Sequence, residues 1–257
     1  MQRHIIPPSR LFNACLGLLA LFATASRAQE WTWPEKPANL QVLDKTWPGS
    51  RLSPVMRGFT RALGVRCTYC HVGEEGKPLT TYDFASDMNP NKNRAREMLR
   101  MLGSINEHLK KIEPSGEKRV NMWCHTCHEG RPRPMTLEEE LGEKYRAKGI
   151  EASVAHYSEL KKKFYGRGGY DFGERSLNTF GYELLEKDTA AAIRIFILNT
   201  QEYPQSPNAW DSLAEAYMKA GDIPHAKQYY EKSLELNPES ETAKEMLKKI
   251  KEGETMR

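Results

Sequence analysis

The chain lacks a long apolar run and has few cysteines. Of its 257 residues, five are cysteine. The apolar run over residues 11–25 follows Arg3 and Arg10, and it is too short for a comfortable membrane span. Small residues stand at the end of this segment, in the pattern that a signal peptidase reads. Residues 1–28 therefore predict a cleaved signal peptide, with a retained membrane anchor as the alternative.

Without that segment the chain also lacks a strong charge of either sign. The whole chain carries 38 basic and 34 acidic side chains, and the segment holds three of the arginines and no acid. The exported chain then has 35 bases against 34 acids, a net charge of +1. That balance gives no argument for a nucleic-acid partner. We expect a periplasmic or other extracytoplasmic location, with peripheral membrane association left open.

Cysteine is confined to two short motifs once Cys15 is lost with the signal segment. Both motifs read Cys-x-x-Cys-His, at residues 67–71 and 124–128, which is the attachment signature of a c-type haem. The two thiols add to the vinyl groups of one haem, and the histidine comes beneath the iron as proximal ligand. The chain therefore predicts two covalently bound haem c groups. Their residues are Cys67, Cys70, His71, Cys124, Cys127 and His128.

Two other interpretations of the cysteine pairs stay open. In one, both pairs together hold one structural zinc. In the other, each pair forms a disulfide or a redox dithiol in an exported protein. The gap between Cys70 and Cys124 is long for a zinc ribbon. Neither alternative explains why a histidine follows each pair, so the haem interpretation accounts for more of the pattern.

The first motif is expected to follow a helix that carries a sulfur ligand. Ser53 and Pro54 are suited to open this helix as N-cap and first-turn residue, and Gly64 is suited to end it. Met56 lies on the helix, 11 residues before Cys67. Its thioether is therefore a candidate for the far side of the first haem, with plain core packing as the alternative.

A second, longer helix is expected to run from Asn89 to about Ile112. Its apolar residues alternate at spacings of three and four, which indicates one buried stripe. Met101 lies on the flank of that stripe, one turn from Met98, and His108 lies on the same helix. All three are candidates for the distal ligand of the second haem.

Three stretches, 56–71, 95–106 and 124–130, carry a family resemblance in their order, spacing and flanking residues. Over about residues 50–135 the chain resembles the cytochrome c subunit of photosynthetic reaction centres. The reaction-centre members carry four haems, whereas this chain has two motifs and so resembles half of that subunit. The resemblance implies a haem domain that transfers electrons. It leaves docking to a photosynthetic reaction centre open.

The resemblance also implies distal ligands. In that family a helix precedes each haem motif, and a methionine on the helix is usually the distal ligand of the iron. Carried over to this sequence, Met56 matches the ligand of the first haem. Met101 best matches the ligand of the second, because Ile105-Asn106 follows it, and Met98 is the alternative.

Residues 136–172 are expected to form a helical linker. Thr136 and Glu139 make a capping box that opens one helix, and a second helix is expected from about 152 to 164. Glycines within 166–169 then break the chain, which favours a domain boundary.

The C-terminal part contains an internal repeat, and residues 173–252 predict two tetratricopeptide repeats with a capping helix from 241 to 250. Such repeats resemble protein-binding scaffolds, so we expect a protein partner or self-association. The recurring positions, 34 residues apart, are Ala226, Tyr230 and Pro238 with Ala192, Phe196 and Pro204.

The sequence as a whole predicts a mainly α protein: a dihaem domain over 29–135, then the linker, then the repeat domain. With both axial positions of each iron filled, substrate chemistry is not expected. The first hypothesis is therefore an electron carrier, not an enzyme, with redox partner proteins as donor and acceptor. The alternatives are a dihaem peroxidase, which needs an open iron with a distal acid or base, and a redox-sensing interaction protein.

Overall fold

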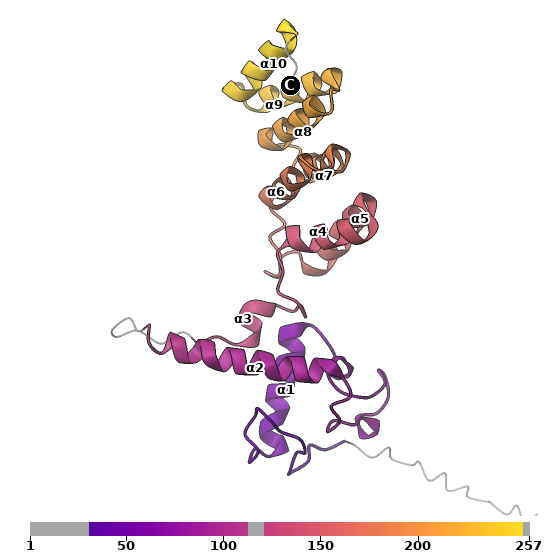
Figure 1. Cartoon of the computed structure of the whole chain (residues 1–257), viewed down its shortest axis with the longest axis vertical. Coiled ribbons are helices and arrows are strands. Elements are labelled where there is room, and N and C mark those ends of the chain that lie inside the picture. The colour runs from indigo at the N-terminus through magenta and orange to yellow at the C-terminus, as the bar shows by residue number, and fades with distance from the viewer. Residues whose placement is uncertain (1–30, 113–120, 254–257) are drawn as a thin grey trace, which may run out of the picture.

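Two helical parts make up the protein, one above the other in Figure 1. The computed structural model describes residues 31–112 and 121–253, and the expected signal segment 1–28 lies outside them. Within these ranges the regular elements are all helices, apart from one isolated antiparallel bridge between Val72 and Asp83. The mainly α fold class is confirmed. None of the helices in the described ranges is long and apolar enough to cross a membrane.

The helix before the first motif, α1 (Gly49–Leu63), starts earlier than the sequence predicts. Its N-cap is Pro48, whose carbonyl accepts hydrogen bonds from two first-turn amides at 3.0 and 3.2 Å. Ser53 and Pro54, predicted to open the helix, lie inside it, so that prediction was wrong. A proline removes one interior hydrogen bond, and the helix already established by its first turn continues past that loss. Gly64 ends α1 in the left-handed conformation, as predicted, with φ of 64°.

The long helix α2 (Pro90–Leu109) crosses α1 in Figure 1. Its start is confirmed, because the Asn89 side chain accepts a hydrogen bond from the amide of Asn91 at 3.1 Å. It ends three residues before Ile112. The remaining short elements of this part are the 3₁₀ turns η1 (Cys67–Tyr69) and η2 (Leu79–Thr81) and the helix α3 (Cys124–His128).

The second part is an array of antiparallel helices that stack toward the C-terminus (Figure 1). Thr136 and Glu139 form the predicted capping box, and side chains of Asp188, Ser206 and Asp222 cap later helices in the same way. The helices are α4 (Leu137–Lys148), α5 (Ile150–Phe164), α6 (Glu174–Leu185), α7 (Thr189–Glu202), α8 (Pro207–Lys219), α9 (Ile223–Leu236) and α10 (Glu241–Glu252).

One continuous apolar core runs through α4 to α8. Leu141 of α4, Tyr157 of α5 and Phe180 of α6 are each 1% exposed and belong to it. The segment 136–172, expected as a linker, thus adds a helical hairpin that shares the core of the array. Within the glycine-containing stretch 166–169, Gly169 is buried and the other three residues are exposed. The domain boundaries themselves stay a prediction.

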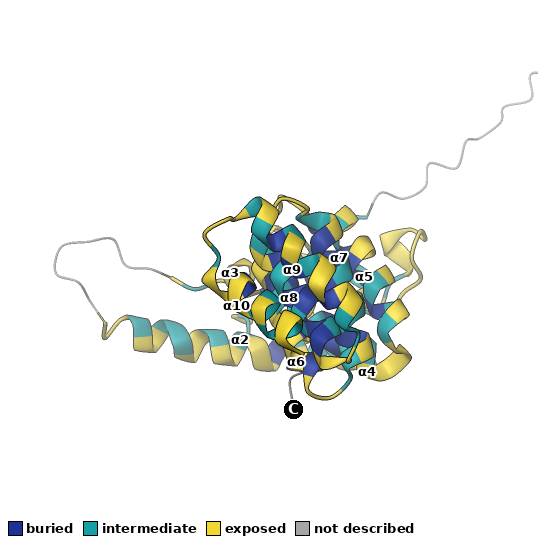
Figure 2. Cartoon of the chain, turned by 90° about the horizontal axis from the view of Figure 1, so that it is seen from above, coloured by how far each residue is buried: buried dark blue, intermediate teal, exposed yellow. Residues whose placement is uncertain are grey.

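The two parts bury very different amounts of apolar side chain. Dark blue, the colour of buried residues, gathers in the array in Figure 2, whereas α2 is mainly teal and yellow. Between 31 and 135, the described residues include two buried apolar side chains, those of Leu52 and Ala62. The haem part therefore does not close a core of its own among its described residues.

Candidate haem-binding sites

The first motif, residues 67–71, is folded as one tight helical turn. The amides of Cys70 and His71 both donate to the carbonyl of Cys67, at 3.2 and 2.9 Å. Side-chain amides of two asparagines at the start of α2 donate to the carbonyls of the residues between the cysteines, at 3.2 and 2.9 Å. The motif is thereby held against the N-terminus of α2, with both thiols half-buried.

Met56 and His71 line the same cavity. Cys70 of the motif and Phe59 of α1 lie in its wall as well, and one face of α2 closes it through Leu99 and its neighbours. The structure thus brings the predicted proximal and distal ligands of the first haem to one cavity, together with one attachment cysteine. The ligand roles stay a prediction.

The His71 imidazole is in the form that binds a metal. Burial lowers its pKa, and the nearby positive charge of Lys92 lowers the pKa further, which favours the neutral ring. Its edge meets the Phe84 ring, with centroids 5.1 Å apart. The Nδ1 atom is buried and has no hydrogen-bond partner among the described residues. A neutral imidazole with an unused ring nitrogen fits a metal ligand.

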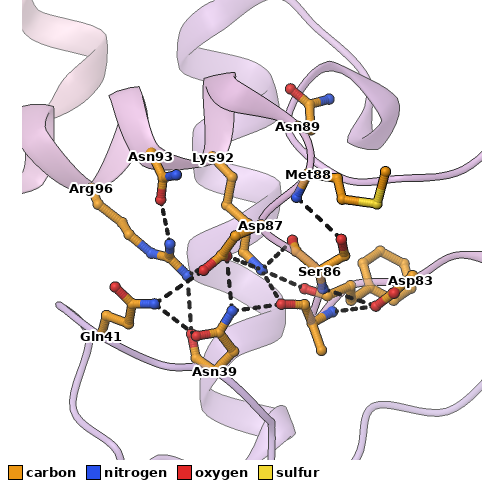
Figure 3. Close-up of polar contacts among 12 residues, drawn as sticks. Asn39, Gln41, Asp83, Ser86, Asp87, Met88, Asn89, Lys92, Asn93 and Arg96 are labelled. Atoms are coloured by element: carbon orange, nitrogen blue, oxygen red, sulfur yellow. Dashed lines mark hydrogen bonds and ion pairs between the residues drawn. The ribbon is translucent and has the colours of Figure 1, made fainter.

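Beside this cavity lies a polar network that sequence reasoning missed (Figure 3). Asp87 accepts from the guanidinium of Arg96 at 2.8 Å and from the side-chain amide of Asn39 at 2.8 Å. The Arg96 guanidinium holds the pKa of the Asp87 carboxyl well below its usual range. The Lys92 ammonium donates to three loop carbonyls at 2.8 to 2.9 Å. Lys92 and Arg96 therefore place two fixed cations in the cavity wall.

The second motif forms the short helix α3 and is held by both long helices of this part. The ring of Trp123, the residue before the motif, stacks on Phe59 of α1 with centroids 5.8 Å apart. The side chain of Asn106 in α2 exchanges two hydrogen bonds with the backbone of Met122, at 2.8 and 3.0 Å. Cys124 is half-buried and Cys127 is exposed.

His128 is oriented by the residue three positions after it. Its side chain is 7% exposed, and its Nδ1 lies 2.8 Å from the carbonyl oxygen of Arg131. A carbonyl only accepts hydrogen bonds, so Nδ1 carries the proton and Nε2 keeps its lone pair. This is the tautomer of a histidine that binds a metal through Nε2, with the other nitrogen held by a backbone carbonyl.

The candidates for the second distal ligand are not brought to His128. Met101 is 48% exposed and Met98 is 41% exposed, and His108 is exposed too. At 100° per residue, both methionines lie on the flank of α2 away from the face that lines the first cavity. Among the described residues, no hydrogen bond, ion pair or ring contact joins any of the three to His128. The choice of Met101 stays a prediction, with Met98 and His108 as alternatives.

The residues of this part fit a large apolar group. A domain of this size normally buries more of its own side chains. Among the described residues of 31–135, Leu52 is the one large apolar side chain that is buried, and the others are half-buried or exposed. Haem is a flat apolar group whose faces and edges would cover such side chains. The exposed ones in this part are Tyr69, Val72, Leu79, Met88, Met98, Met101, Ile112 and Trp123.

The two cysteine pairs do not converge on a common metal site. No group of three or more histidine, cysteine, aspartate or glutamate side chains in the described ranges is arranged to hold a metal ion. The four cysteines outside the signal segment form no disulfide. Each pair therefore stands as a separate site next to its own histidine.

Two family models match parts of this chain. The family model of the photosynthetic reaction centre cytochrome C subunit matches residues 66–161. This part of the chain resembles that subunit. The match begins after Met56 and extends through α4 into α5, so it includes both motifs and much of the first hairpin of the array. The tetratricopeptide repeat model matches residues 207–240, which hold α8 and α9.

The same comparison covered curated proteins and solved structures. No curated protein matches the chain. One solved structure that matches is the first TPR of Spaghetti (RPAP3) bound to the HSP90 peptide SRMEEVD, with 18% sequence identity and a TM-score of 0.33. The match covers 46% of this chain and 89% of that one. The family matches therefore support a haem c cytochrome of the electron-carrier kind, with a repeat of the protein-interaction kind.

Proposed function

We propose that the chain is an exported dihaem c-type cytochrome that transfers electrons between redox partner proteins. Haem c is attached through the cysteines of residues 67–71 and of residues 124–128. One-electron redox chemistry is what a bound haem supplies. The role of the protein is to hold each haem, to set its reduction potential and to exclude substrate chemistry at the iron. The family match over 66–161 supports the electron-carrier assignment.

In this proposal His71 and Met56 are the axial ligands of the first haem. The observation that carries the proposal is the shared cavity, which both side chains line together with Cys70. A histidine and methionine pair raises the reduction potential relative to two histidines. Lys92 and Arg96 in the same wall share the single carboxylate of Asp87, which leaves a net positive charge there. That charge also favours the reduced state, because the added electron makes the site more negative.

For the second haem we propose His128 and Met101. The hydrogen bond from His128 Nδ1 to a backbone carbonyl supports the first assignment. Met101 is supported by the family resemblance, because Ile105-Asn106 follows it. With methionine on the far side of both irons, neither iron is left open for a substrate.

We infer that the repeat array binds a protein partner or a second copy of the chain. Its match to the tetratricopeptide repeat family supports an interaction role. Export to the periplasm or another extracytoplasmic space is supported by the basic start and short apolar run of residues 1–28. The mature protein is then expected to begin at Gln29, which N-terminal sequencing tests.

Haem content tests the cofactor assignment directly. Acid-acetone extraction of the denatured protein is expected to leave two haems per chain, measured as pyridine haemochrome. The double substitution Cys67→Ala with Cys70→Ala is expected to leave one, and Cys124→Ala with Cys127→Ala the other one. Extraction of both haems from the unmodified sequence by acid-acetone would contradict covalent attachment.

Absorbance spectra test the electron-carrier assignment against the peroxidase. Six-coordinate, low-spin spectra in both redox states are expected. A high-spin fraction that binds hydrogen peroxide would instead support a dihaem peroxidase. A partner whose affinity changes with the redox state would support a redox sensor.

A further inference from the structure

The junction between the haem part and the array is built around a buried guanidinium. Arg131 is 7% exposed, although it stands three residues after His128 in the connection to α4. A buried charge is costly unless it is paired and hydrogen-bonded, so its partners show what the residue does. They come from both parts of the protein.

Toward the second motif, Arg131 makes three hydrogen bonds with His128. Its carbonyl accepts from His128 Nδ1 at 2.8 Å, its backbone amide donates to the His128 carbonyl at 2.8 Å, and its Nε donates to that carbonyl at 3.3 Å. The guanidinium also lies 3.6 Å from the carboxylate of Glu129. The backbone between His128 and Arg131 is therefore closed into one small hydrogen-bonded unit.

Toward the array, the same guanidinium stacks on an aromatic ring. The Cζ atom of Arg131 lies 4.4 Å from the centroid of Tyr170, and its Nη1 donates to the carbonyl of Met135 just before α4. Tyr170 is not a loose surface ring. It meets the edges of Phe164 and Phe172, with centroids 5.3 and 6.0 Å away, and both are buried in the core of the array.

The backbone at Gly169 lies at ordinary contact distance from the same loop. A Cβ atom at this position would lie 3.6 Å from the Glu129 carbonyl and 3.7 Å from Arg131 Nε. The loop that links α5 to α6 thus touches the loop that follows the second motif. A guanidinium is attracted to the face of an aromatic ring, and more strongly when the contact is shielded from water.

We infer that Arg131 is a positioning residue for His128, and that its stacking on Tyr170 makes the first hairpin of the array part of the support of the second haem. The inference rests on the proposed function, because it takes His128 as an axial ligand. A carbonyl acceptor on Nδ1 makes the imidazole a stronger donor to iron and stabilises the oxidised state. Loosening Arg131 weakens that hydrogen bond and favours the reduced state of the second haem.

The test is a redox titration of full-length holoprotein carrying Tyr170→Leu, which removes the ring and keeps apolar volume. At the native midpoint of the second haem, its reduced fraction is expected to rise above one half, while the first haem is unchanged. Tyr170→Phe keeps the ring and is expected to restore native behaviour. The two potentials are assigned with the paired cysteine-to-alanine variants.

A matched control separates positioning from general destabilisation. Tyr182 packs on Phe196 in the same array, with ring centroids 5.2 Å apart. Its hydroxyl donates to Ser212 and Glu215, which also belong to the array. Tyr182→Leu is expected to lower the melting temperature without moving either potential. Arg131→Met removes the guanidinium directly and covers the case in which Tyr170→Leu does not accumulate. Arg131→Met is expected to shift the reduction potential of the second haem in the same direction as Tyr170→Leu.

The possible failures are distinguishable. If Tyr170→Leu and Arg131→Met keep two haems and leave both potentials at their native values, the inference is overturned and the proposed function stands. If Tyr182→Leu moves the second potential as much as Tyr170→Leu does, the effect is general loosening and the inference is overturned as well. If the native protein carries no haem at the second motif, the proposed function fails first and the inference with it.

Discussion

Replacing Gly64 by alanine probes the contact that joins α1 to the loop after the second motif. Gly64 ends α1 with φ of 64°, a conformation in which a side chain is strained. A Cβ atom there would lie 2.1 Å from the carbonyl oxygen of Gly130. Close by, the amide of Gly130 donates to the carbonyl of Ala62 at 2.8 Å. The substitution therefore strains the backbone at residue 64 and displaces the backbone of Gly130.

The loss of stability in Gly64→Ala is the sum of three contributions. The left-handed conformation costs a non-glycine residue about 1 kcal/mol. Separating the two backbones adds about 1 kcal/mol for the weakened hydrogen bond, and the displaced packing adds a similar amount. We expect Gly64→Ala to lower the free energy of unfolding of the haem part by about 2 to 3 kcal/mol.

Gly76→Ala is the matched control. Gly76 also has a positive φ, of 85°, but a Cβ atom there would meet nothing within 4 Å. It should show the conformational cost alone, about 1 kcal/mol. Denaturant unfolding of both holoproteins, followed by far-ultraviolet circular dichroism and haem absorbance, measures the difference. Equal costs for the two variants would refute the close approach of Gly64 and Gly130.

Three further predictions concern axial ligands and acid stability. Met56→Leu is expected to lower the potential of one haem, or raise its high-spin fraction, at a stability cost below about 1.5 kcal/mol, measured by redox titration and thermal unfolding. Met101→Leu is expected to act in the same way on the other haem, and an effect of Met98→Leu in its place would transfer the role. The amide of Ala191 and the Tyr145 hydroxyl hold the pKa of Asp188 below its usual value, so its stabilising effect is present above about pH 4 and lost as the pH falls further. Asp188→Ala is therefore expected to cost about 1 kcal/mol at pH 7 and less at pH 3, in melting curves at both pH values.

Local signals were enough to predict several helix ends. Asn89 and Thr136 cap their helices through contacts that lie within four residues, and Gly64 supplies a conformation that depends on its own backbone. The start of α1 was different. The amide of Gly49 donates to the carbonyl of Pro34 at 3.0 Å, so the preceding arm helps to place the first turn. No pattern around Ser53 and Pro54 contains that information.

In the candidate site, too, some features follow from the local sequence and others depend on contacts between distant residues. The motif residues follow from spacing alone, and the shared cavity of Met56 and His71 agrees with a ligand pair that the sequence suggested. Arg131 and Asp87 were missed because their partners lie on other elements, on Tyr170 and Arg96. A charged residue beside a haem motif carries no sign in the sequence that it is buried.

The uneven distribution of apolar burial also changes how the two parts depend on each other. The glycine-containing stretch before α6 suggested two modules that act separately, but its buried Gly169 touches the loop after the second motif. The array supplies its own core from α4 to α8. The haem part has few buried apolar side chains among its described residues. In the proposed holoprotein its helices are therefore held by the haem groups and by the contacts at the junction. A rigid array therefore stabilises the second motif through Arg131, and the reverse dependence is weaker because the array does not need the haem part to close its core.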